Sequence, residues 1–423
     1  MIEWSETHLS IRDSIRKFCK AEVEPKLHAI EHEGEPPYAV LRKLVAAFGI
    51  ADMARMRFTA QIEKQKLREA SGEPPKPRAS REGQPSPEAA LEMAMQMIPI
   101  IELSRWSPGM VTALGVSMGL TARSIMSKGT IRQKERWALD LLTLDTIGAW
   151  AITEPGSGSD AFGAMKSTAR RDGDGYVLNG SKTFITNGPY ADTIVFICKL
   201  DAGSPSNVTE GSTEKPKVLT FVLDGGGKTK GLVQSKPLRK LGLHGSPTGE
   251  LFLDDVRVGK EHLLGETEDA PSRAETKDTF TSERTAVAAM ALGIVEECQR
   301  LSIDYAKTRV QFGRPIGEFQ LIQLKLAKME VARSNIQNLV FRQIEMAGAG
   351  RSMSLAEASA CKLYCAQAAM DVCNETVQLF GGNGYMSEYR VEQLFRDARV
   401  LQIYGGTDEI QISQIARSLL GEA

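Results

Sequence analysis

The sequence has few cysteines, almost no net charge and no long apolar run. Its 423 residues contain 52 Lys and Arg against 53 Asp and Glu, and a net charge of −1 provides no field that would attract a nucleic acid backbone. No apolar run reaches the roughly 18 residues that a membrane span requires. The six cysteines form neither a disulfide framework nor a CxxC metal pair. We therefore expect no nucleic acid partner, no membrane span and reduced thiols.

The composition that is present is typical of a globular protein. Hydrophobic residues make up 42% of the chain and charged residues 25%, which excludes general disorder. The first residues, MIEWSETHLSIRDSIRKF, contain acids and no apolar signal core, which favours a cytoplasmic location. At roughly 150 residues per domain, the length predicts about three domains.

Three regions with different periodicity follow one another. Residues 1–148 carry apolar residues at helical spacing and predict an N-terminal helical domain. Residues 149–265 contain β-branched runs such as DTIVFICKL and KVLTFVLDG between turn residues, and predict a middle antiparallel β-barrel domain. Residues 266–423 return to the helical period and predict a C-terminal four-helix bundle. The expected fold class is a multidomain α and β protein.

Two polar segments interrupt these regions. Residues 70–88 contain five prolines, which exclude a continuous helix: Pro74, Pro75, Pro77, Pro85 and Pro87. We predict a loop or disordered insertion there, with a docking segment as the less favoured alternative. The turn-rich residues 201–217 predict a surface excursion between two strands.

His28 and His32 lie four residues apart on a predicted helix, a spacing that could hold a metal ion. No third ligand stands in a matching motif, and a solvated helix face is the favoured interpretation. We therefore expect no metal site.

A glycine-rich turn, AITEPGSGSDAFG, opens the middle region at residues 151–163. Its Thr153, Ser157 and Ser159 would bring hydroxyls and backbone N–H groups together, as the oxygens of a pyrophosphate require. The turn matches neither a Walker loop nor a Rossmann fingerprint, and taken alone an ordinary interdomain turn explains it better.

Four further blocks make the pattern specific. They are KTFITNG at 182–188, KTRVQFGRPI at 307–316, QLFGGNGYMSEYRVEQLFRDAR at 378–399 and IYGGTDEIQ at 403–411. Together with the turn, they resemble the acyl-CoA dehydrogenase family over the whole chain except the proline-rich insertion. Gln393 departs from the family pattern, in which a Lys or Arg is usual. The resemblance implies the acyl-CoA dehydrogenase-like fold.

The resemblance also implies FAD bound non-covalently between the middle and C-terminal domains, with part of the dinucleotide contacted by a second subunit of a homotetramer or dimer. Phe184 falls where the family places an aromatic ring against the isoalloxazine, and a guanidinium such as that of Arg309 can pair with pyrophosphate in a bidentate way. A helix C-cap is an equally good reason for the glycines in the third block. Carried over position by position, the cofactor-binding residues are Ile152, Thr153, Ser159, Phe184, Thr186, Arg309, Phe312, Gln320, Gln378, Gly381, Gly382, Thr407 and Glu409.

The catalytic base that the resemblance implies is Glu283. Dehydrogenation of an acyl thioester requires a carboxylate to take the α proton while the β hydrogen leaves as hydride to the flavin. In many family members that carboxylate follows the IY of the last block, where this sequence has Gly405. The resemblance to isovaleryl-CoA and long-chain acyl-CoA dehydrogenases instead implies Glu283. Helical spacing puts Glu283 on the apolar stripe of Val287 and Met290, and burial would raise its pKa. The alternative is a capping-type acid in the first helical turn.

The substrate residues that the resemblance implies are Ser159, Ser246 and Arg284. A turn preference explains Ser246 as well, and a structural ion pair explains Arg284. The N–H of Gly405, with a flavin ribityl hydroxyl, would polarise the thioester carbonyl.

The sequence therefore predicts an FAD-dependent acyl-CoA dehydrogenase of fatty acid metabolism and β-oxidation. It would form trans-2-enoyl-CoA and pass electrons to an electron-transfer flavoprotein. A flavin monooxygenase or oxidase on the same fold is one alternative, and a non-catalytic partner subunit of a hetero-oligomeric dehydrogenase is another. The sequence does not predict the acyl chain.

Overall fold

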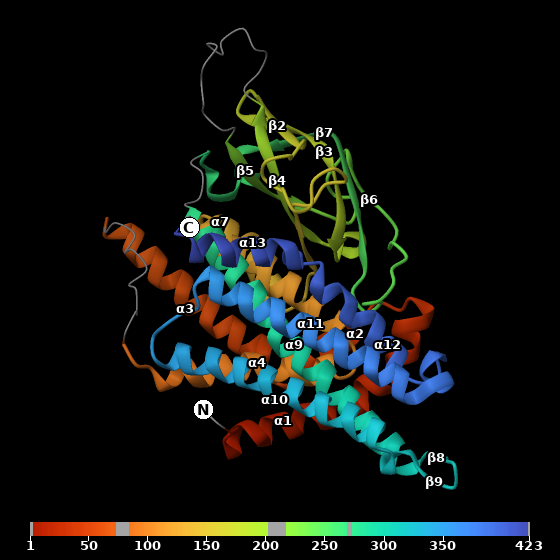
Figure 1. Cartoon of the computed structure of the whole chain (residues 1–423). Helices are drawn as coiled ribbons and strands as arrows, with labels where there is room; N and C mark the ends of the chain where they lie inside the picture. The colour runs from red at the N-terminus through yellow and green to blue at the C-terminus, as the bar shows by residue number, and fades with distance from the viewer. Residues whose placement is uncertain (1–2, 73–83, 202–216, 269–272, 422–423) are drawn as a thin grey trace.

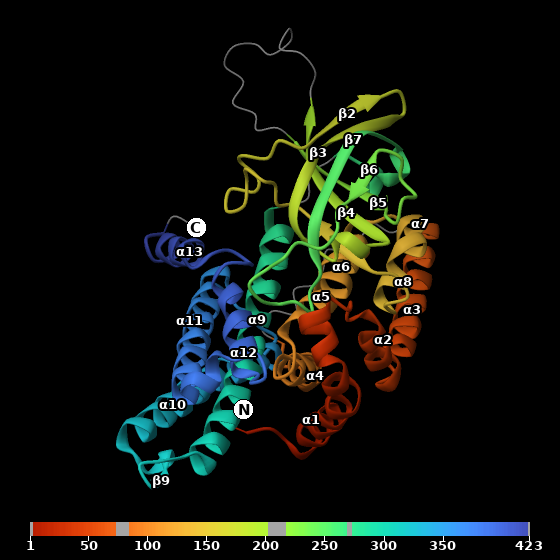
Figure 2. The same ribbon diagram turned by 90° about the vertical axis from the view of Figure 1, so that its right-hand side faces the viewer.

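The computed structural model describes residues 3–72, 84–201, 217–268 and 273–421 (Figure 1). A curled β-sheet lies over one end of a larger helical body (Figures 1 and 2). The helix, sheet, helix order expected from the sequence is confirmed. None of the helices in the described ranges is long and apolar enough to cross a membrane.

In the first helical region, side-chain caps mark the starts of two helices. Ser5 and His8 form a capping box at the start of the first helix, and Ser86 accepts a hydrogen bond from the N–H of Ala89 at the start of the fourth. The helices are α1 (Glu6–Phe18), α2 (Tyr38–Ala47), α3 (Ile50–Ala70), α4 (Pro87–Ser104), α5 (Pro108–Leu114), α6 (Ala122–Lys128), α7 (Ile131–Gln133) and α8 (Leu139–Leu142).

The proline-rich loop is shorter than predicted. Helix α3 continues to Ala70, and α4 already begins at Pro87, since proline is tolerated in the first helical turn. The rest of the predicted insertion falls mostly on residues 73–83, and the predicted surface excursion on residues 202–216; both lie outside the described residues.

The middle region is a mixed sheet. Strand β4 pairs with β5 on one side and with β1 and β2 on the other, and the sheet continues through β3, β7 and β6. The strands are β1 (Gly148–Ala151), β2 (Thr168–Asp172), β3 (Gly175–Thr186), β4 (Thr193–Asp201), β5 (Val218–Asp224), β6 (Leu232–Gln234) and β7 (Thr248–Gly259).

The prediction of a wholly antiparallel sheet is wrong at two pairings, because β1 and β2 both run parallel to β4. Two hydrogen bonds hold the starts of β1 and β4 together. The Ile147 N–H donates to the Asp192 carboxylate at 2.9 Å, and the Asp192 N–H donates back to the Ile147 carbonyl at 2.8 Å. Strands β1 and β4 therefore leave the helical body from one point and in one direction.

The last region contains three long helices: α9 (Arg273–Thr308), α10 (Gln320–Gly348) and α11 (Leu355–Phe380). Helices α9 and α11 run parallel, because Arg284 bonds to Ser359 near one end and the Tyr305 and Phe380 rings stack near the other. Helix α4 of the first region packs against α9 and α10, so the bundle takes one helix from the N-terminal part. Two shorter helices, α12 (Val391–Arg399) and α13 (Asp408–Leu419), pack on α11.

The six cysteines are free and buried, as core residues. Cys298 and Cys373 approach to 3.6 Å between α9 and α11, and Cys361 and Cys365 lie in the core of α11. The interpretation of the α11 cysteines as core residues is confirmed.

Candidate functional site

The glycine-rich turn is fixed by a buried ion pair. Lys182 on β3 donates to Glu154 at 2.8 Å and to the carbonyl of Ile152 at 3.0 Å, and its side chain is fully buried. The Glu154 carboxylate also accepts from the backbone N–H groups of Lys166 and Ser167, which closes the loop on itself. These hydrogen bonds keep the pKa of Glu154 below its ordinary value despite burial.

The ITNG block joins the sheet to the first helical region. The buried Asn187 amide donates to the carbonyls of Ala113 and Gly148, and its oxygen accepts from the Tyr38 hydroxyl, each at 2.9 Å. Its neighbour Phe184 is 69% exposed on a left-handed backbone with φ of 56°. A bulky residue seldom adopts this conformation, so a strained backbone presents the Phe184 ring to the exterior of the described chain.

Glu283 lies well inside α9. The helix begins at Arg273, so the alternative of a capping acid in the first turn is wrong. Glu283 is half-buried, and Val287 and Met290 on its stripe are 3% and 4% exposed. Burial raises the pKa of Glu283, and the positive charges of Arg284 and Lys362 offset part of that rise.

Gly405 faces this carboxylate. A Cβ added to Gly405 would lie 3.5 Å from both the Cδ and an oxygen of Glu283. Gly405 and Gly406 have φ values of 61° and 87°, a left-handed turn that favours glycine. The structure thus brings the predicted base, Glu283, next to Gly405, the position at which many family members carry the carboxylate.

The other residues that were predicted to bind the cofactor near Glu283 lie on neighbouring elements. Ile152 is 8% exposed and Thr153 accepts from the Thr183 N–H at 2.9 Å, while Ser159 is exposed on the glycine-rich turn. Thr186 ends β3 and is half-buried. Thr407 caps α13, and Glu409 is exposed in its first turn.

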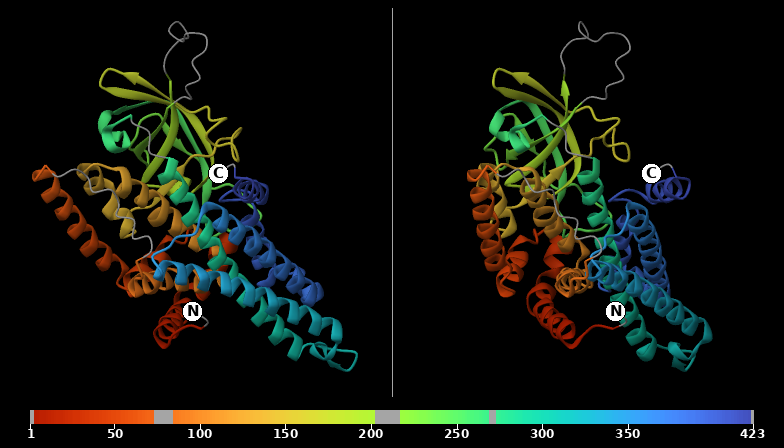
Figure 3. Two further views of the ribbon diagram at one scale, coloured as in Figure 1. Left: turned by 60° about the vertical axis from the view of Figure 1, so that its left-hand side comes forward. Right: turned by 90° about the vertical axis from the view of Figure 1, so that its left-hand side faces the viewer.

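A second set of predicted residues lies at the far end of the bundle. Arg309, Phe312 and Gln320 are exposed around the hairpin of β8 (Val310–Gln311) and β9 (Arg314–Pro315). Gln378, Gly381 and Gly382 are exposed at the end of α11, where Gly381 caps the helix with φ of 61°. The hairpin lies far from the sheet in every view (Figures 1 to 3).

The length of α9 separates the two sets. Its last residue, Thr308, lies 25 residues after Glu283. At 1.5 Å per residue this is about 38 Å along the helix axis, which is longer than a dinucleotide can bridge. One copy of the chain therefore cannot contact one FAD molecule with both sets.

Two of the predicted substrate residues are buried. Ser246 is 2% exposed, and its N–H lies against α5, since a Cβ on Gly109 would approach it to 2.9 Å. Arg284 is 6% exposed and donates to the Ser359 hydroxyl at 2.9 Å. One of its nitrogens would lie 3.7 Å from a Cβ on Gly406, so Arg284 packs behind the glycine turn.

Three residues of this site were not predicted from the sequence: Lys362, Gln411 and Tyr404. Lys362 and Gln411 are fully buried and donate to the carbonyls of the Gly405–Gly406 turn. The Tyr404 hydroxyl contacts the sulfur of Met290 at 3.3 Å, beside Glu283. A charged residue on the apolar stripe of α11 is the signal that could have identified Lys362, by the argument that was used for Glu283.

The described residues fit FAD at both ends. Phe184 and Phe312 are both exposed and both strained, with φ of 56° and 51°. A Cβ on Gly156, Gly158 or Gly381 would meet no atom of the described chain within 4 Å, which leaves room for a ligand against the backbone. Exposed aromatic rings that are held on a strained backbone, together with open glycine backbone, provide surface that a planar cofactor can cover.

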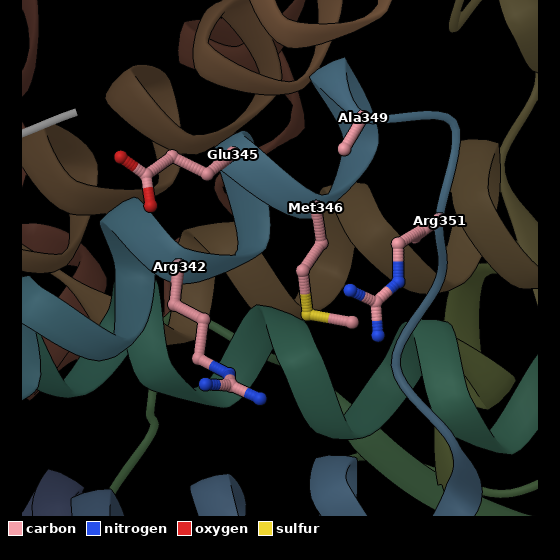
Figure 4. Close-up of a pocket in the computed structure, with 5 residues that line it drawn as sticks. All are labelled: Arg342, Glu345, Met346, Ala349 and Arg351. Atoms are coloured by element: carbon pink, nitrogen blue, oxygen red, sulfur yellow. The ribbon is translucent and has the colours of Figure 1, made fainter. Parts of the chain in front are cut away.

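A separate pocket, with a volume of about 230 Å³, lies at the end of α10, and its lining residues are drawn in Figure 4. Arg342, Met346 and Arg351 project toward one another there, while Glu345 points away. Arg342 is paired with Glu357 at 3.0 Å. The lining residues of this pocket differ from those of the predicted site.

His28 and His32 lie on an exposed face, with ring centroids 5.0 Å apart, and His28 lies 3.5 Å from Glu33. Within the described ranges, no group of three or more His, Cys, Asp or Glu side chains could hold a metal ion.

Comparisons with known proteins agree over the whole chain. Residues 149–256 match the acyl-CoA dehydrogenase middle domain and residues 274–420 match the acyl-CoA dehydrogenase C-terminal domain. The chain is 35% identical over 419 residues to a 3-(aryl)acrylate reductase of Clostridium sporogenes and 33% identical over 421 residues to an acyl-CoA dehydrogenase of Bacillus subtilis, with 99% of each protein covered. The structure of butyryl-CoA dehydrogenase from Megasphaera elsdenii matches with a TM-score of 0.79 at 28% identity, covering 99% of this chain and 100% of that one.

Proposed function

Because the chain belongs to the acyl-CoA dehydrogenase family of FAD-dependent oxidoreductases, we propose that it dehydrogenates an acyl-CoA thioester with Glu283 as the base. The observation that carries this proposal is the approach of Glu283 to Gly405. The carboxylate on α9 occupies the space into which a side chain at position 405 would project, at 3.5 Å. A base can therefore reach the same substrate carbon from α9, in place of one on the turn.

Each residue has a separate task in this mechanism. The Glu283 carboxylate takes the α proton, and its raised pKa brings it closer to the pKa of an efficient base. The Gly405 N–H donates to the thioester carbonyl, which stabilises the negative charge that develops there as the proton leaves. When bound, FAD accepts the β hydrogen as hydride. The Tyr404 hydroxyl contacts the Met290 sulfur beside the carboxylate, and these two side chains would limit the access of water to it.

FAD would be bound by two copies of the chain. In this proposal Phe184, Thr153 and Ser159 contact the flavin and pyrophosphate beside the copy's own Glu283. Arg309 and Phe312 reach the FAD of the neighbouring copy, because they lie about 38 Å away along α9. The assembly is a homodimer or a homotetramer built from such pairs.

The site supports a class of substrate, and it is compatible with either direction of the reaction. A site that removes an α proton and a β hydride also works in reverse, so the name of the Clostridium sporogenes relative, a reductase of arylacrylates, is compatible with the same residues. We propose acyl-CoA thioesters as the substrates, trans-2-enoyl-CoA as the product and an electron-transfer flavoprotein as the electron acceptor in fatty acid β-oxidation.

The test is an anaerobic titration of the flavin absorbance with a panel of acyl-CoA thioesters. The purified protein is expected to be yellow, and at least one thioester should bleach it. Glu283→Gln should keep the flavin and reduce it about 10²- to 10⁴-fold more slowly, because the base is lost while the fold remains.

Glu296→Gln is the matched control, because Glu296 also lies on α9 and burial also raises its pKa. It should retain the wild-type rate. Full activity in Glu283→Gln would refute the assignment of the base. Failure of all thioesters to bleach the wild-type flavin would instead favour a non-catalytic subunit, and rapid oxygen consumption by the reduced protein would favour an oxidase.

A further inference from the structure

Lys362 on α11 is a lysine with no exposed surface. A lysine is seldom fully buried unless its charge is paired or hydrogen-bonded. Burial lowers the pKa of Lys362, while the nearby Asp408 and Glu283 oppose that effect. A buried cation in this position needs a structural or chemical reason.

The ammonium group of Lys362 contacts the turn that faces Glu283. Its Nζ donates to the carbonyl of Gly406 at 2.8 Å and lies 3.7 Å from the carboxylate of Asp408. Asp408 in turn accepts from the side chains of Gln367 and Gln402, each at 3.1 Å. The ammonium group of Lys362 is therefore held between the Gly406 carbonyl and the Asp408 carboxylate.

Gln411 acts on the same turn from α13. Its amide nitrogen donates to the carbonyl of Gly405 at 3.0 Å and to that of Gly406 at 2.8 Å. Both carbonyls of the glycine turn are thus directed into the bundle. Among the described residues, the Gly405 N–H has no protein acceptor, so it remains available to a ligand.

Lys362 also acts on Glu283 electrostatically. Among the described side chains, Arg284 on the same helix, Lys362 on α11 and Tyr404 on the turn segment interact with that carboxylate, and Asp408 on α13 acts on Lys362. Lys362 also donates to the carbonyl of Gly406 in the glycine turn. It can therefore link the position of the turn to the charge state of the base.

We propose that Lys362 is a positioning residue: with Gln411 it fixes the Gly405–Gly406 turn so that the Gly405 N–H meets the thioester carbonyl while Glu283 faces the α carbon. This inference rests on the proposed function. It assigns to α11 a part in the reaction without direct contact with substrate.

The test compares three variants that separate the hydrogen bonds to the turn from the charge beside Glu283. Lys362→Met removes one hydrogen bond and the charge, whereas Lys362→Arg keeps the charge. Gln411→Met removes two hydrogen bonds to the turn without changing any charge. Lys362→Met should lower kcat on the order of a hundredfold with a smaller change in KM, because a displacement of about 1 Å can cost that much. Gln411→Met should also lower kcat, and Lys362→Arg should recover part of it.

The pH profile distinguishes a positioning role from a merely structural one. Glu283 must be ionised to act, so kcat rises with pH through its pKa. Without the Lys362 charge that pKa increases, and the acidic limb of the Lys362→Met profile should move to higher pH. The limb should stay in place for Lys362→Arg and Gln411→Met.

A binding measurement gives a readout that does not depend on turnover. In the Glu283→Gln background, calorimetry with an acyl-CoA that reduces the wild-type flavin should show Kd raised roughly fivefold to tenfold by Lys362→Met, because one hydrogen bond to the thioester is lost. If Lys362→Met does not fold, the double variant Lys362→Met with Asp408→Asn takes its place, because it also removes the half-buried carboxylate charge that Lys362 leaves unpaired.

Lys134→Met is the matched control, because Lys134 is a buried lysine that bonds to Gln65 far from the glycine turn. It should leave kcat and the pH profile unchanged. Wild-type kcat, Kd and pH profile in Lys362→Met would overturn this inference while leaving the proposed function intact. If none of the thioesters reduced the flavin of the wild-type protein, the proposed function itself would be overturned.

Discussion

Position 405 shows how one missing side chain changes the chemistry of a site. Gly405 adopts a φ of 61°, where a residue with a Cβ is strained by roughly 1–2 kcal/mol. Its missing side chain leaves the space that the Glu283 carboxylate approaches from α9. The glycine and the distant glutamate are therefore two parts of one arrangement.

Gly405→Glu should consequently impair the protein. It would put two carboxylates in one site, so that one of them holds its proton near neutral pH, and it would strain the turn. We expect kcat to fall at least tenfold and its acidic limb to move to higher pH. Removing the original base as well, in Gly405→Glu with Glu283→Ala, should recover part of the activity. Steady-state kinetics of both variants measure this, and an unaltered Gly405→Glu profile would contradict it.

At the scale of elements, residues 238–248 connect all three regions. This segment passes between α5 and α12 with little room: a Cβ on Gly242 would approach the Arg396 backbone to 2.5 Å, and a Cβ on Gly245 would approach the Ser107 hydroxyl to 2.6 Å. The Leu243 N–H donates to the buried carboxylate of Asp397 at 2.5 Å. The segment is therefore a fixed part of the interior.

A second buried carboxylate, Glu31, lies beside this segment. It accepts from Ser107 at 2.9 Å, and its backbone carbonyl lies 2.6 Å from the His244 ring. Burial, with a smaller contribution from Asp397, raises the pKa of Glu31 to about 8. Folding thus favours protonated Glu31, and this stabilising contribution is complete below the ordinary pKa of 4.5 and disappears as the pH rises through 8.

Glu31→Gln should therefore stabilise the protein at alkaline pH. The amide keeps the shape of the acid and cannot ionise. The melting temperature of the variant should therefore exceed that of the wild type at pH 8.5 by a few degrees. The difference should shrink toward pH 5. Thermal unfolding across this pH range measures it. Glu33→Gln, at an exposed position, is the control and should show no such dependence. A constant difference at every pH would contradict the prediction.

At the scale of the whole molecule, α9 carries the base near one end and leads to the hairpin residues at the other, about 38 Å away. Exposed apolar residues at that far end, such as Phe312 at 93% and Tyr385 at 83%, remain to be covered. A neighbouring copy that supplies these residues to another FAD would cover them, as the proposed two-copy site requires.

Mixing two defective variants tests this arrangement. Phe184→Ala should weaken FAD binding on a copy's own side, and Arg309→Ala should weaken it on the neighbour's side. In a mixed pair one site carries both defects and the other carries neither. If pairing is random, about half of the pairs are mixed, and co-expressed variants should therefore bind FAD tightly at about a quarter of their sites, measured by bound flavin per chain. No recovery in the mixture would show that one copy completes its own site.

The sequence predicted much of the fold because its signals are local. Helical periodicity located the two helical regions, and β-branched runs between turn residues located the strands. It failed where distant segments meet. Strands β1 and β4 run parallel, and Ile147 and Asp192, 45 residues apart in the chain, bond to each other just before the two strands begin; no local pattern encodes that pairing.

The sequence by itself determined the chemical groups of this protein: a glutamate at 283, a glycine at 405 and the blocks that resemble FAD-binding motifs. Only the tertiary structure decided how they are arranged. It placed Glu283 inside α9, beyond the first turn, opposed it to Gly405, and buried Lys362 and Gln411 beneath the turn. The reason is that residue type is local, whereas the distances between a base, a backbone amide and a buried cation arise from the packing of α9, α11 and α13.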